Sequence, residues 1–315
     1  MTLQLDPDIA AALAAAAQDA PDLAPPERGD VTALRETTNA TLTALFSGLP
    51  PASDVETAEF QTDADDGTAV GLRWYTKTGE TPGSAIVYAH GGGMICGSAE
   101  IYEPMVKHYV QATGVPFLSV DYRLAPEFPG TVPSGDVLAA IAWLFDRAES
   151  LGVDATRIAL MGDSGGGGVG AGAAILARDN NLRLNRQILI YPMLDDRNTV
   201  PDPALAPTAT WTYDNNYTGW HALLGDAIGG PEVPPAAAPA RLQDMSGLAP
   251  AFIEVGELDI FRDESIDYAQ RLLQAGVSCE LHVIAGAPHA HDMLGMAFDI
   301  GQRSIAERVR VVRSI

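Results

Sequence analysis

The chain has 315 residues, and its 41 Asp and Glu against 19 Lys and Arg give a formal charge of −22 at pH 7. Such a charge repels phosphate backbones and anionic lipid head groups, which argues against nucleic-acid binding and stable membrane binding. Hydrophobic residues make up 47% and charged residues 19% of the chain, a composition typical of a globular protein with a large core. Two cysteines, Cys96 and Cys279, are too few for a disulfide framework and favour a cytoplasmic location. No Lys or Arg precedes Arg28, so we expect no secretory signal.

The chain begins with an Ala- and Pro-rich region, residues 1–55, that is helical in pattern; its apolar stretch 9–17 is too short to span a bilayer. Residues 58–62 and 70–75 flank a turn-rich DADDG segment and predict an antiparallel hairpin. Short β-branched runs then predict buried strands at 84–89, 116–120, 157–161, 187–191, 251–255 and 280–284. Helical segments are predicted at 104–113, 137–150, 170–178, 265–275 and 305–312. This alternation predicts an α/β fold with a mostly parallel sheet of about eight strands, covered by helices on both faces.

A long Pro-rich segment, residues 198–242, interrupts the alternation of strands and helices and carries four aromatic residues, Trp211, Tyr213, Tyr217 and Trp220. The aromatic content argues against disorder. Two interpretations stay open: an aromatic-packed surface excursion, or a lid over a site at the carboxyl ends of the strands, where open α/β sheets bind ligands.

The segment 157–168, RIALMGDSGGGG, places a G-x-S-x-G motif between a predicted strand and a small-residue helix. A nucleophile at so sharp a turn requires small residues two before and two after it, and Gly162 and Gly166 meet this requirement. The motif predicts that Ser164 is a nucleophile at the start of a helix, whose dipole favours developing negative charge. The letters GDSGG also surround the serine of chymotrypsin-like proteases, but those are all-β barrels whose histidine and aspartate precede the serine.

A second glycine-rich motif, YAHGGG at 88–93, follows a predicted strand. Successive glycines let backbone N–H groups approach a substrate oxygen without interference from side chains. A plain glycine turn would have the same letters, but an HGGG segment ahead of a nucleophile elbow is typical of an oxyanion hole.

An acid and then a base must follow Ser164 in this kind of site. Segment 256–264, GELDIFRDE, supplies carboxylates after one predicted strand, and His289 and His291 follow the next. Because the carboxyl ends of parallel strands meet at one edge of a sheet, we expect these groups to lie near Ser164. Position alone leaves His291 as an alternative to His289.

Six motifs occur in order over nearly the whole chain, and together they resemble the hormone-sensitive-lipase-like family of α/β-hydrolase carboxylesterases, the bacterial family IV esterases. They are YAHGGG (88–93), VDYRLAPE (120–127), GDSGGG (162–167), IYPMLDD (190–196), GELDIFRDE (256–264) and GAPHAHD (286–292). The resemblance implies the α/β-hydrolase fold with a helical cap. The cap corresponds to residues 1–55 and 198–242, and the hydrolase core to 56–197 and 243–315.

The same resemblance implies roles for single residues. Asp259 matches the catalytic acid and His289 the catalytic histidine, while the backbone amides of Gly92, Gly93 and Gly165 match the oxyanion donors. Two positions depart from the family pattern. Glycine replaces the usual alanine at position 165, which we expect to loosen the loop, and His291 stands where an aromatic residue is usual.

The predicted function is a serine carboxylesterase that acts on small esters with short- to medium-chain acyl groups and needs no metal or cofactor. Met94, Met193, Trp211 and Trp220 are predicted to line a modest apolar pocket, although such residues are also common in cores. Amidase, lactonase and thioesterase activities share the same chemistry and stay open. A non-hydrolytic receptor on this fold is disfavoured because it has no use for His289. The resemblance also suggests a homodimer through the last strand or the C-terminal helix.

Overall fold

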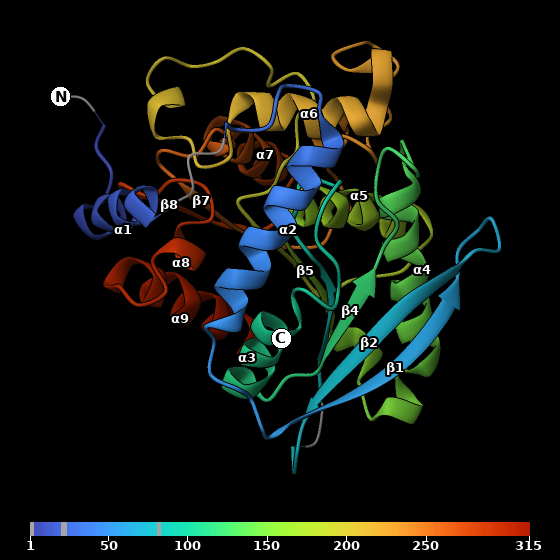
Figure 1. Ribbon diagram of the computed structural model, residues 1–315. Coiled ribbons are helices and arrows are strands. Elements are labelled where there is room, and N and C mark those ends of the chain that lie inside the picture. Colours follow the sequence, from blue (N-terminus) through green and yellow to red (C-terminus); the bar gives the residue numbers. More distant parts are fainter. Residues whose placement is uncertain (1–2, 20–23, 81–82) are drawn as a thin grey trace.

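Eight strands form one sheet in the order β1-β2-β4-β3-β5-β6-β7-β8 in the computed structural model, which describes residues 3–19, 24–80 and 83–315 (Figure 1). The strands are β1 (Val55–Asp63), β2 (Ala69–Lys77), β3 (Ala85–Ala89), β4 (Phe117–Asp121), β5 (Ile158–Asp163), β6 (Gln187–Ile190), β7 (Ala251–Gly256) and β8 (Cys279–Ile284). β1, β2 and β4 pair antiparallel, and every pairing from β4 to β8 is parallel. The predicted hairpin and the predicted mostly parallel sheet are therefore confirmed.

Helices cover both faces of the sheet. On one face lie α3 (Glu103–Thr113) and α9 (Asp299–Arg313), and on the other lie α4 (Val132–Arg147), α5 (Gly165–Asp179) and α7 (Arg262–Gln274). Alternate residues of β3 point to opposite faces of the sheet. Ile86 and Tyr88 pack with α3 and α9 on one face, whereas Ala85 and Val87 pack with α4 and α5 on the other. All five residues of β3 are buried, as expected for a central parallel strand.

Several helices, among them α4, α5, α7 and α9, begin earlier than the sequence pattern predicts. α4 begins at Val132, because Pro133 in its first turn is compatible with a helix start. α5 begins at Gly165 although glycine is a poor helix former. Tertiary packing explains the glycines there, since a Cβ atom at Gly168 would lie 2.0 Å from the Met193 carbonyl oxygen.

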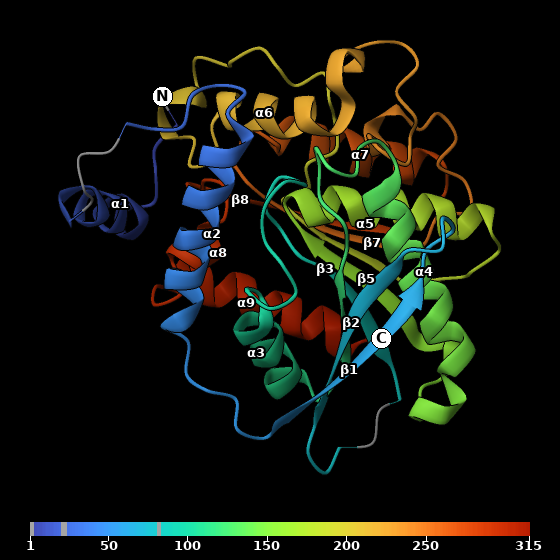
Figure 2. The ribbon, with the colours of Figure 1, turned by 45° about the vertical axis from the view of Figure 1, so that its right-hand side comes forward.

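Three helices, α1 (Pro7–Asp19), α2 (Val31–Ser47) and α6 (Tyr213–Leu224), lie outside the sheet and its covering layers (Figure 2). A short helix, α8 (His291–Leu294), contacts α1 and α9. α2 is capped by the Asp30 carboxylate, which accepts a hydrogen bond from Ala33 N, and it buries Leu34, Leu42 and Phe46. It contacts both α6 and α3, so it connects the segment 198–242 to the core.

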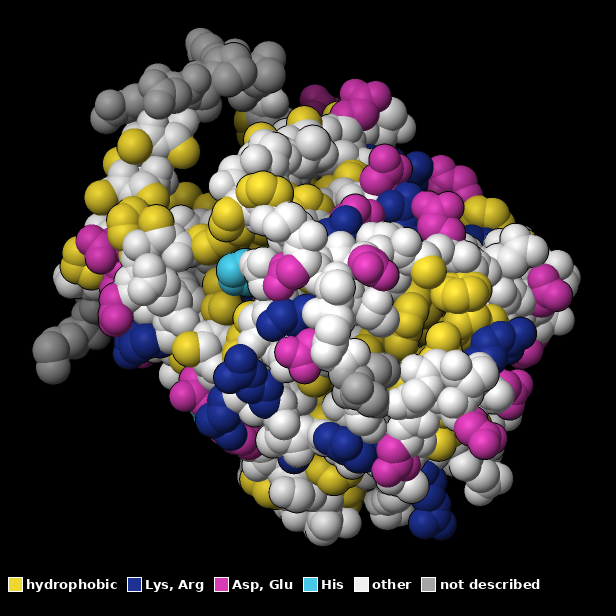
Figure 3. Space-filling view, turned by 90° about the horizontal axis from the view of Figure 1, so that it is seen from below, with side chains coloured by type: hydrophobic (Ala, Val, Ile, Leu, Met, Phe, Trp, Pro, Cys, Tyr) yellow, Lys and Arg dark blue, Asp and Glu magenta, His cyan; other side chains and the backbone are white. Residues whose placement is uncertain are grey.

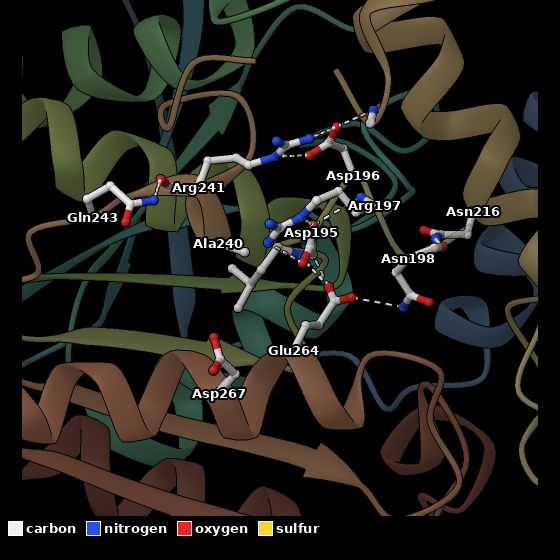
Figure 4. A network of polar contacts seen from close by, with 12 residues as sticks. Asp195, Asp196, Arg197, Asn198, Asn216, Ala240, Arg241, Gln243, Glu264 and Asp267 are labelled. Atoms are coloured by element: carbon white, nitrogen blue, oxygen red, sulfur yellow. Dashed lines mark hydrogen bonds and ion pairs between the residues drawn. The ribbon is translucent and has the colours of Figure 1, made fainter. Parts of the chain in front are cut away.

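The segment that carries α6 begins and ends at a buried ion pair (Figure 4). Asp196, which is fully buried, accepts hydrogen bonds of 2.7 and 2.8 Å from Nε and Nη2 of Arg241. It accepts a third bond of 2.7 Å from Gly229 N. Since Asp196 precedes the segment and Arg241 lies at its end, this pair closes the base of the excursion.

Charged side chains of both signs are interspersed on the face seen from below in Figure 3. The net charge of −22 is therefore not displayed there as a single negative patch. Among the helices in the described part of the chain, none combines the length and the apolarity needed to cross a membrane.

Removing the Asp196 carboxylate should destabilise the fold. Asp196→Ala leaves the Arg241 guanidinium and Gly229 N–H without their acceptor, and breaking a buried pair from one side costs about 3 kcal/mol. We expect that decrease in the free energy of unfolding, measured by urea denaturation. Arg197→Ala, which removes the more exposed pair with Asp195, is the control and should cost less than about 1 kcal/mol. Equal stability of the two variants would contradict the prediction.

Candidate functional site

Ser164 stands at the turn between β5 and α5 with φ 54° and ψ −122°, a conformation that few residues other than glycine adopt. The neighbouring glycines are required by packing. A Cβ atom at Gly162 would lie 2.3 Å from the Gly166 carbonyl oxygen, and one at Gly166 would lie 2.2 Å from the Ala89 carbonyl oxygen. The structure thus shows why the motif needs small residues on both sides of Ser164.

Three side chains from three different loops form a continuous chain of polar contacts. His289 Nε2 lies 2.9 Å from Ser164 Oγ, and His289 Nδ1 lies 2.7 Å from Asp259 Oδ2. The other carboxylate oxygen of Asp259 accepts a hydrogen bond of 2.9 Å from Phe261 N. Asp259 is fully buried, while Ser164 and His289 are each 6% exposed. With a proton on Nδ1, His289 donates to Asp259 and accepts the Ser164 hydroxyl proton through Nε2.

The ring and backbone of His289 are held on several sides. Tyr191 and Phe261 present ring edges to it at centroid distances of 4.8 and 5.1 Å. Thr210 Oγ1 donates a hydrogen bond of 2.7 Å to the His289 carbonyl oxygen. Because Thr210 belongs to the segment 198–242, that segment helps to position the histidine.

A glycine loop, residues 90–97, faces Ser164 from the end of β3. Gly92 has φ 121° and Gly93 has φ 58°, so both occupy backbone conformations that favour glycine. Within the described residues, the backbone N–H groups of Gly92, Gly93 and Gly165 donate no hydrogen bond. These amides are therefore free to bind an oxygen that carries negative charge.

The glycine at position 165 has a different consequence from the expected loosening of the loop. A Cβ atom there would lie 2.6 Å from both Gly93 N and Met94 N. The absence of a side chain therefore allows the glycine loop to approach the start of α5 closely.

Backbone strain gathers around this site. Five non-glycine residues in the described ranges have positive φ, namely Met94, Ser164, Asn181, Tyr191 and Ala290. Met94 lies in the glycine loop, and Ala290 directly follows His289. Strained residues are common where a fold holds reacting groups in fixed positions.

A cavity of about 270 Å³ opens over Ser164 and His289, and its lining is mainly apolar. Helix α2 supplies Leu34, Thr37, Thr38, Thr41, Leu42 and Leu45 to this lining. Other parts of the chain supply Pro26, Gly92, Tyr102, Asp163, Tyr191, Thr210, Trp211, Asn215, Ala290, Met293 and Leu294. The contribution of α2 to this lining could not be predicted from the sequence, because a run of Thr and Leu in a helix does not reveal which face meets a cavity.

Of the four residues predicted to line a pocket, only Trp211 lies on this cavity. Met94, Met193 and Trp220 are at most 1% exposed and belong to the hydrophobic core, so for this cavity their prediction is wrong. The Met94 side chain fills space next to Gly168, and the Met193 side chain lies next to Gly219. These two methionine side chains therefore pack inside the protein, that of Met94 against α5 and that of Met193 against α6 of the segment 198–242.

His291 is fully buried in a different place from His289. Its Nε2 atom lies 2.9 Å from Ser304 Oγ and 3.6 Å from a Glu254 carboxylate oxygen. Burial lowers the pKa of His291. Nearby, Arg308 pairs with both Glu254 and Asp292. This buried ionic cluster holds α9 against β7 and the start of α8, and His291 makes no contact with Ser164.

Asp163, next to Ser164, is a further residue of the site that was not predicted from the sequence. It is 4% exposed and borders the cavity, and its carboxylate accepts hydrogen bonds of 2.5 Å from Tyr88 and 3.1 Å from Tyr102. Burial raises the pKa of Asp163 to about 6, although the bonds from both tyrosines act in the opposite direction. The motif G-x-S-x-G leaves this position unspecified, so it carried no signal.

One group of possible metal ligands occurs in the described part of the chain, formed by Glu280, His282 and Glu307. It lies on β8 and α9 and does not border the cavity. Arg310 pairs with both glutamates, so their carboxylates already have a cationic partner.

Comparison with known proteins agrees with this geometry. A family model described as the alpha/beta hydrolase fold matches residues 86–293. The chain belongs to the α/β-hydrolase family. This match, together with the esterases described next, confirms the resemblance to the hormone-sensitive-lipase-like family drawn from the sequence.

Curated relatives in this family include ethyl acetate hydrolase of Pseudomonas putida, 34% identical over 73% of this chain and 74% of that protein. Carboxylesterase NlhH of Mycobacterium tuberculosis is 38% identical over 62% of each chain. Among solved structures, a bacterial heroin esterase superposes with a TM-score of 0.88 at 34% identity, covering 99% of this chain and 98% of that one. The α/β-hydrolase assignment therefore extends over the whole length of the chain.

Asp163 should make stability depend on pH. Its pKa is about 6 in the folded chain against an ordinary value of 3.8, so the folded chain binds this proton more tightly. Its contribution to stability is therefore greatest below pH 3.8 and is lost as the pH rises through 6.

We expect raising the pH from 5 to 7 to cost the wild type about 1 kcal/mol more than it costs Asp163→Asn, measured by urea denaturation at both pH values. The quantity to compare is the change in the free energy of unfolding between pH 5 and pH 7 within each protein, because the substitution also changes the hydrogen bonds to Tyr88 and Tyr102 and so the stability at any single pH. Identical pH differences in the two proteins would contradict the prediction.

Proposed function

We propose that this protein hydrolyses small carboxylic esters through an acyl-enzyme intermediate on Ser164. The observation that carries the proposal is the unbroken contact from Ser164 to His289 and Asp259, at 2.9 and 2.7 Å, beside backbone amides that donate to no group of the described chain. The relatives named above are all esterases or ester hydrolases by name, which supports the class carboxylic ester hydrolase for this chain.

In the first half of the reaction, Ser164 Oγ attacks the ester carbonyl carbon while His289 Nε2 accepts the hydroxyl proton. The carbonyl oxygen gains negative charge and is bound by the amides of Gly92, Gly93 and Gly165. His289 then gives the proton to the leaving alkoxide oxygen, so an alcohol departs and Ser164 holds the acyl group. The carboxylate of Asp259 stabilises the imidazolium formed in between.

In the second half, water takes the place of the alcohol. His289 accepts a proton from the water as its oxygen attacks the acyl carbon, and it returns that proton to Ser164 Oγ when the bond to the acyl group breaks. The product is a carboxylic acid, and the enzyme regains its starting state. Apart from the ester, the complete reaction consumes only one molecule of water.

The cavity supports small substrates. Its volume of about 270 Å³ lies near the lower end of the usual range for small-molecule pockets, and its apolar lining suits a short- to medium-chain acyl or alkyl group. We also propose that α2 and the segment 198–242 act as a cap, because both supply side chains to this cavity. The homodimer and the cytoplasmic location stay predictions.

Loss of the nucleophile should abolish turnover. Ser164→Ala is expected to lower kcat for p-nitrophenyl butyrate by about six orders of magnitude, as in other serine hydrolases. The measurement is initial rate, with circular dichroism to show that the variant is folded. A fluorophosphonate probe should add to Ser164 in the wild type and be found there by peptide mass spectrometry. A variant that kept most of its activity would refute the proposal.

Substitution of His289 and substitution of His291 should have clearly different effects on kcat. His289→Ala removes the base and is expected to lower kcat by several orders of magnitude. His291→Ala leaves the contact between Ser164 and His289 intact, so kcat should stay within about tenfold while the melting temperature falls, because Ser304 loses a buried partner. A greater loss of kcat in His291→Ala would reverse the assignment.

A further inference from the structure

We propose that Asn39 and Arg35 of α2 are positioning residues for the glycine loop, so that the helix lining the substrate cavity also fixes the oxyanion donors. The inference rests on the proposed function and extends it to a helix outside all six motifs. It is carried by hydrogen bonds between the side chains of α2 and the backbone of the loop.

The glycine loop is a closed turn held by its own backbone hydrogen bonds. Ile95 N and Cys96 N both donate to the Gly92 carbonyl oxygen, at 3.1 and 2.9 Å. The turn is also tightly packed, since a Cβ atom at Gly92 would lie 2.3 Å from the Cys96 carbonyl oxygen. A shift at residues 95–97 is therefore transmitted to Gly92 and Gly93, whose amides face Ser164.

Helix α2 holds the far end of this turn at two points. Asn39 Oδ1 accepts a hydrogen bond of 2.8 Å from Gly97 N, and Arg35 Nε donates one of 2.6 Å to the Ile95 carbonyl oxygen. The two residues are four apart, so they lie on one face of the helix. Both contacts are made with backbone groups, and they fix the path of the loop directly.

Arg35 is itself held in place. Its Nη2 atom donates a hydrogen bond of 2.7 Å to the Ala125 carbonyl oxygen, and Glu127 accepts bonds of 2.8 Å from both Nη1 and Nη2. A bidentate pair with a carboxylate fixes the plane of the guanidinium group. The arginine thus ties the loop to the segment after β4 as well as to α2.

The same helix meets the substrate. Leu34, Thr37 and Thr38 border the cavity and lie in the same two turns of α2 as Arg35 and Asn39. Any group that packs against α2 in the cavity therefore packs against the helix that places Gly92 and Gly93. Displacements of about 1 Å in a catalytic array can cost about 100-fold in rate, so this connection has a kinetic consequence.

The effect should fall on kcat and not on KM, because oxyanion donors bind the transition state more strongly than the substrate. Asn39→Ala removes the acceptor for Gly97 N. We expect kcat for p-nitrophenyl butyrate to fall by about 10- to 100-fold, with KM within about threefold of the wild type. Asn39→Asp keeps an acceptor oxygen and should recover most of the rate. Thr43→Ala, on the exposed side of α2, is the matched control and should behave as the wild type.

A transition-state analogue separates positioning from general destabilisation. An alkyl trifluoromethyl ketone adds to the serine as a hemiketal whose oxyanion occupies the oxyanion hole. Its inhibition constant should rise in Asn39→Ala by the same factor by which kcat/KM falls. Inhibition by the corresponding trifluoromethyl alcohol, which forms no adduct, should not change. A variant that is merely less stable would show a lower melting temperature without this parallel change.

Three outcomes of these experiments would contradict the proposed role of Asn39. Unchanged kcat in a folded Asn39→Ala, an effect on KM alone, or failure of Asn39→Asp to recover activity would overturn the inference. If Asn39→Ala does not fold, Asn39→Ser, whose shorter side chain cannot reach Gly97 N, takes its place with the same expectations. An active wild type with an unaffected variant overturns only this inference. A wild type that hydrolyses no p-nitrophenyl ester overturns the proposed function together with it.

Discussion

The close packing of glycines around Ser164 is the constraint on which the rest of the site depends. Gly162, Gly165, Gly166 and Gly168 each lie where a Cβ atom would collide with backbone atoms of the elbow, of β3, of the glycine loop or of the segment after β6. Because these contacts join separate parts of the chain, the position of the serine oxygen is fixed by the whole central sheet and not by one loop. The strained φ of Ser164 is sustained by the same contacts.

Ionisable side chains are buried on two sides of Ser164, with neutral hydrogen-bond partners on one side and charged partners on the other. Behind the nucleophile, Asp163 is paired with two tyrosine hydroxyl groups, and behind the histidine loop, Arg308 lies between Glu254 and Asp292. The partners of these groups are mainly side chains of the core, although Glu254 Oε2 and His291 Nδ1 have no hydrogen-bond partner among the described residues. The pairs of Arg308 join α9 to β7 and to the start of α8, and so fix the segment that directly follows His289, whose Nε2 lies 2.9 Å from Ser164 Oγ.

The sequence motifs predicted the sheet, the elbow and the carboxylate and histidine near Ser164, because each of these depends on residues close together in the chain with unusual requirements, such as Gly162 and Gly166 around Ser164. They could not predict the cavity. Its lining comes from α2, from Trp211 and from Met293, which meet only in three dimensions. Ordinary hydrophobic residues give no local signal of whether they line a cavity or fill a core, and for that reason Met94, Met193 and Trp220 were misplaced. Asp163 and Asn39 were missed for a related reason, since their partners lie 61 and 58 residues away.

Helix α2 and the segment 198–242, the two parts of the proposed cap, make polar contacts with different sides of the site. The segment 198–242 is closed at its base by Asp196 and Arg241 and reaches the reacting groups through Thr210, which bonds to the backbone of His289. Helix α2 reaches the opposite side of the site through Asn39 and Arg35, which bond to the backbone of the glycine loop. The backbone of His289 and the backbone of the glycine loop are thus each held by a different one of these two elements, and both elements line the cavity. Because α2 and the segment 198–242 both line the cavity, a substrate of the proposed reaction that packs against both would contact the two elements that hold the groups around Ser164, whose exact positions such a reaction requires.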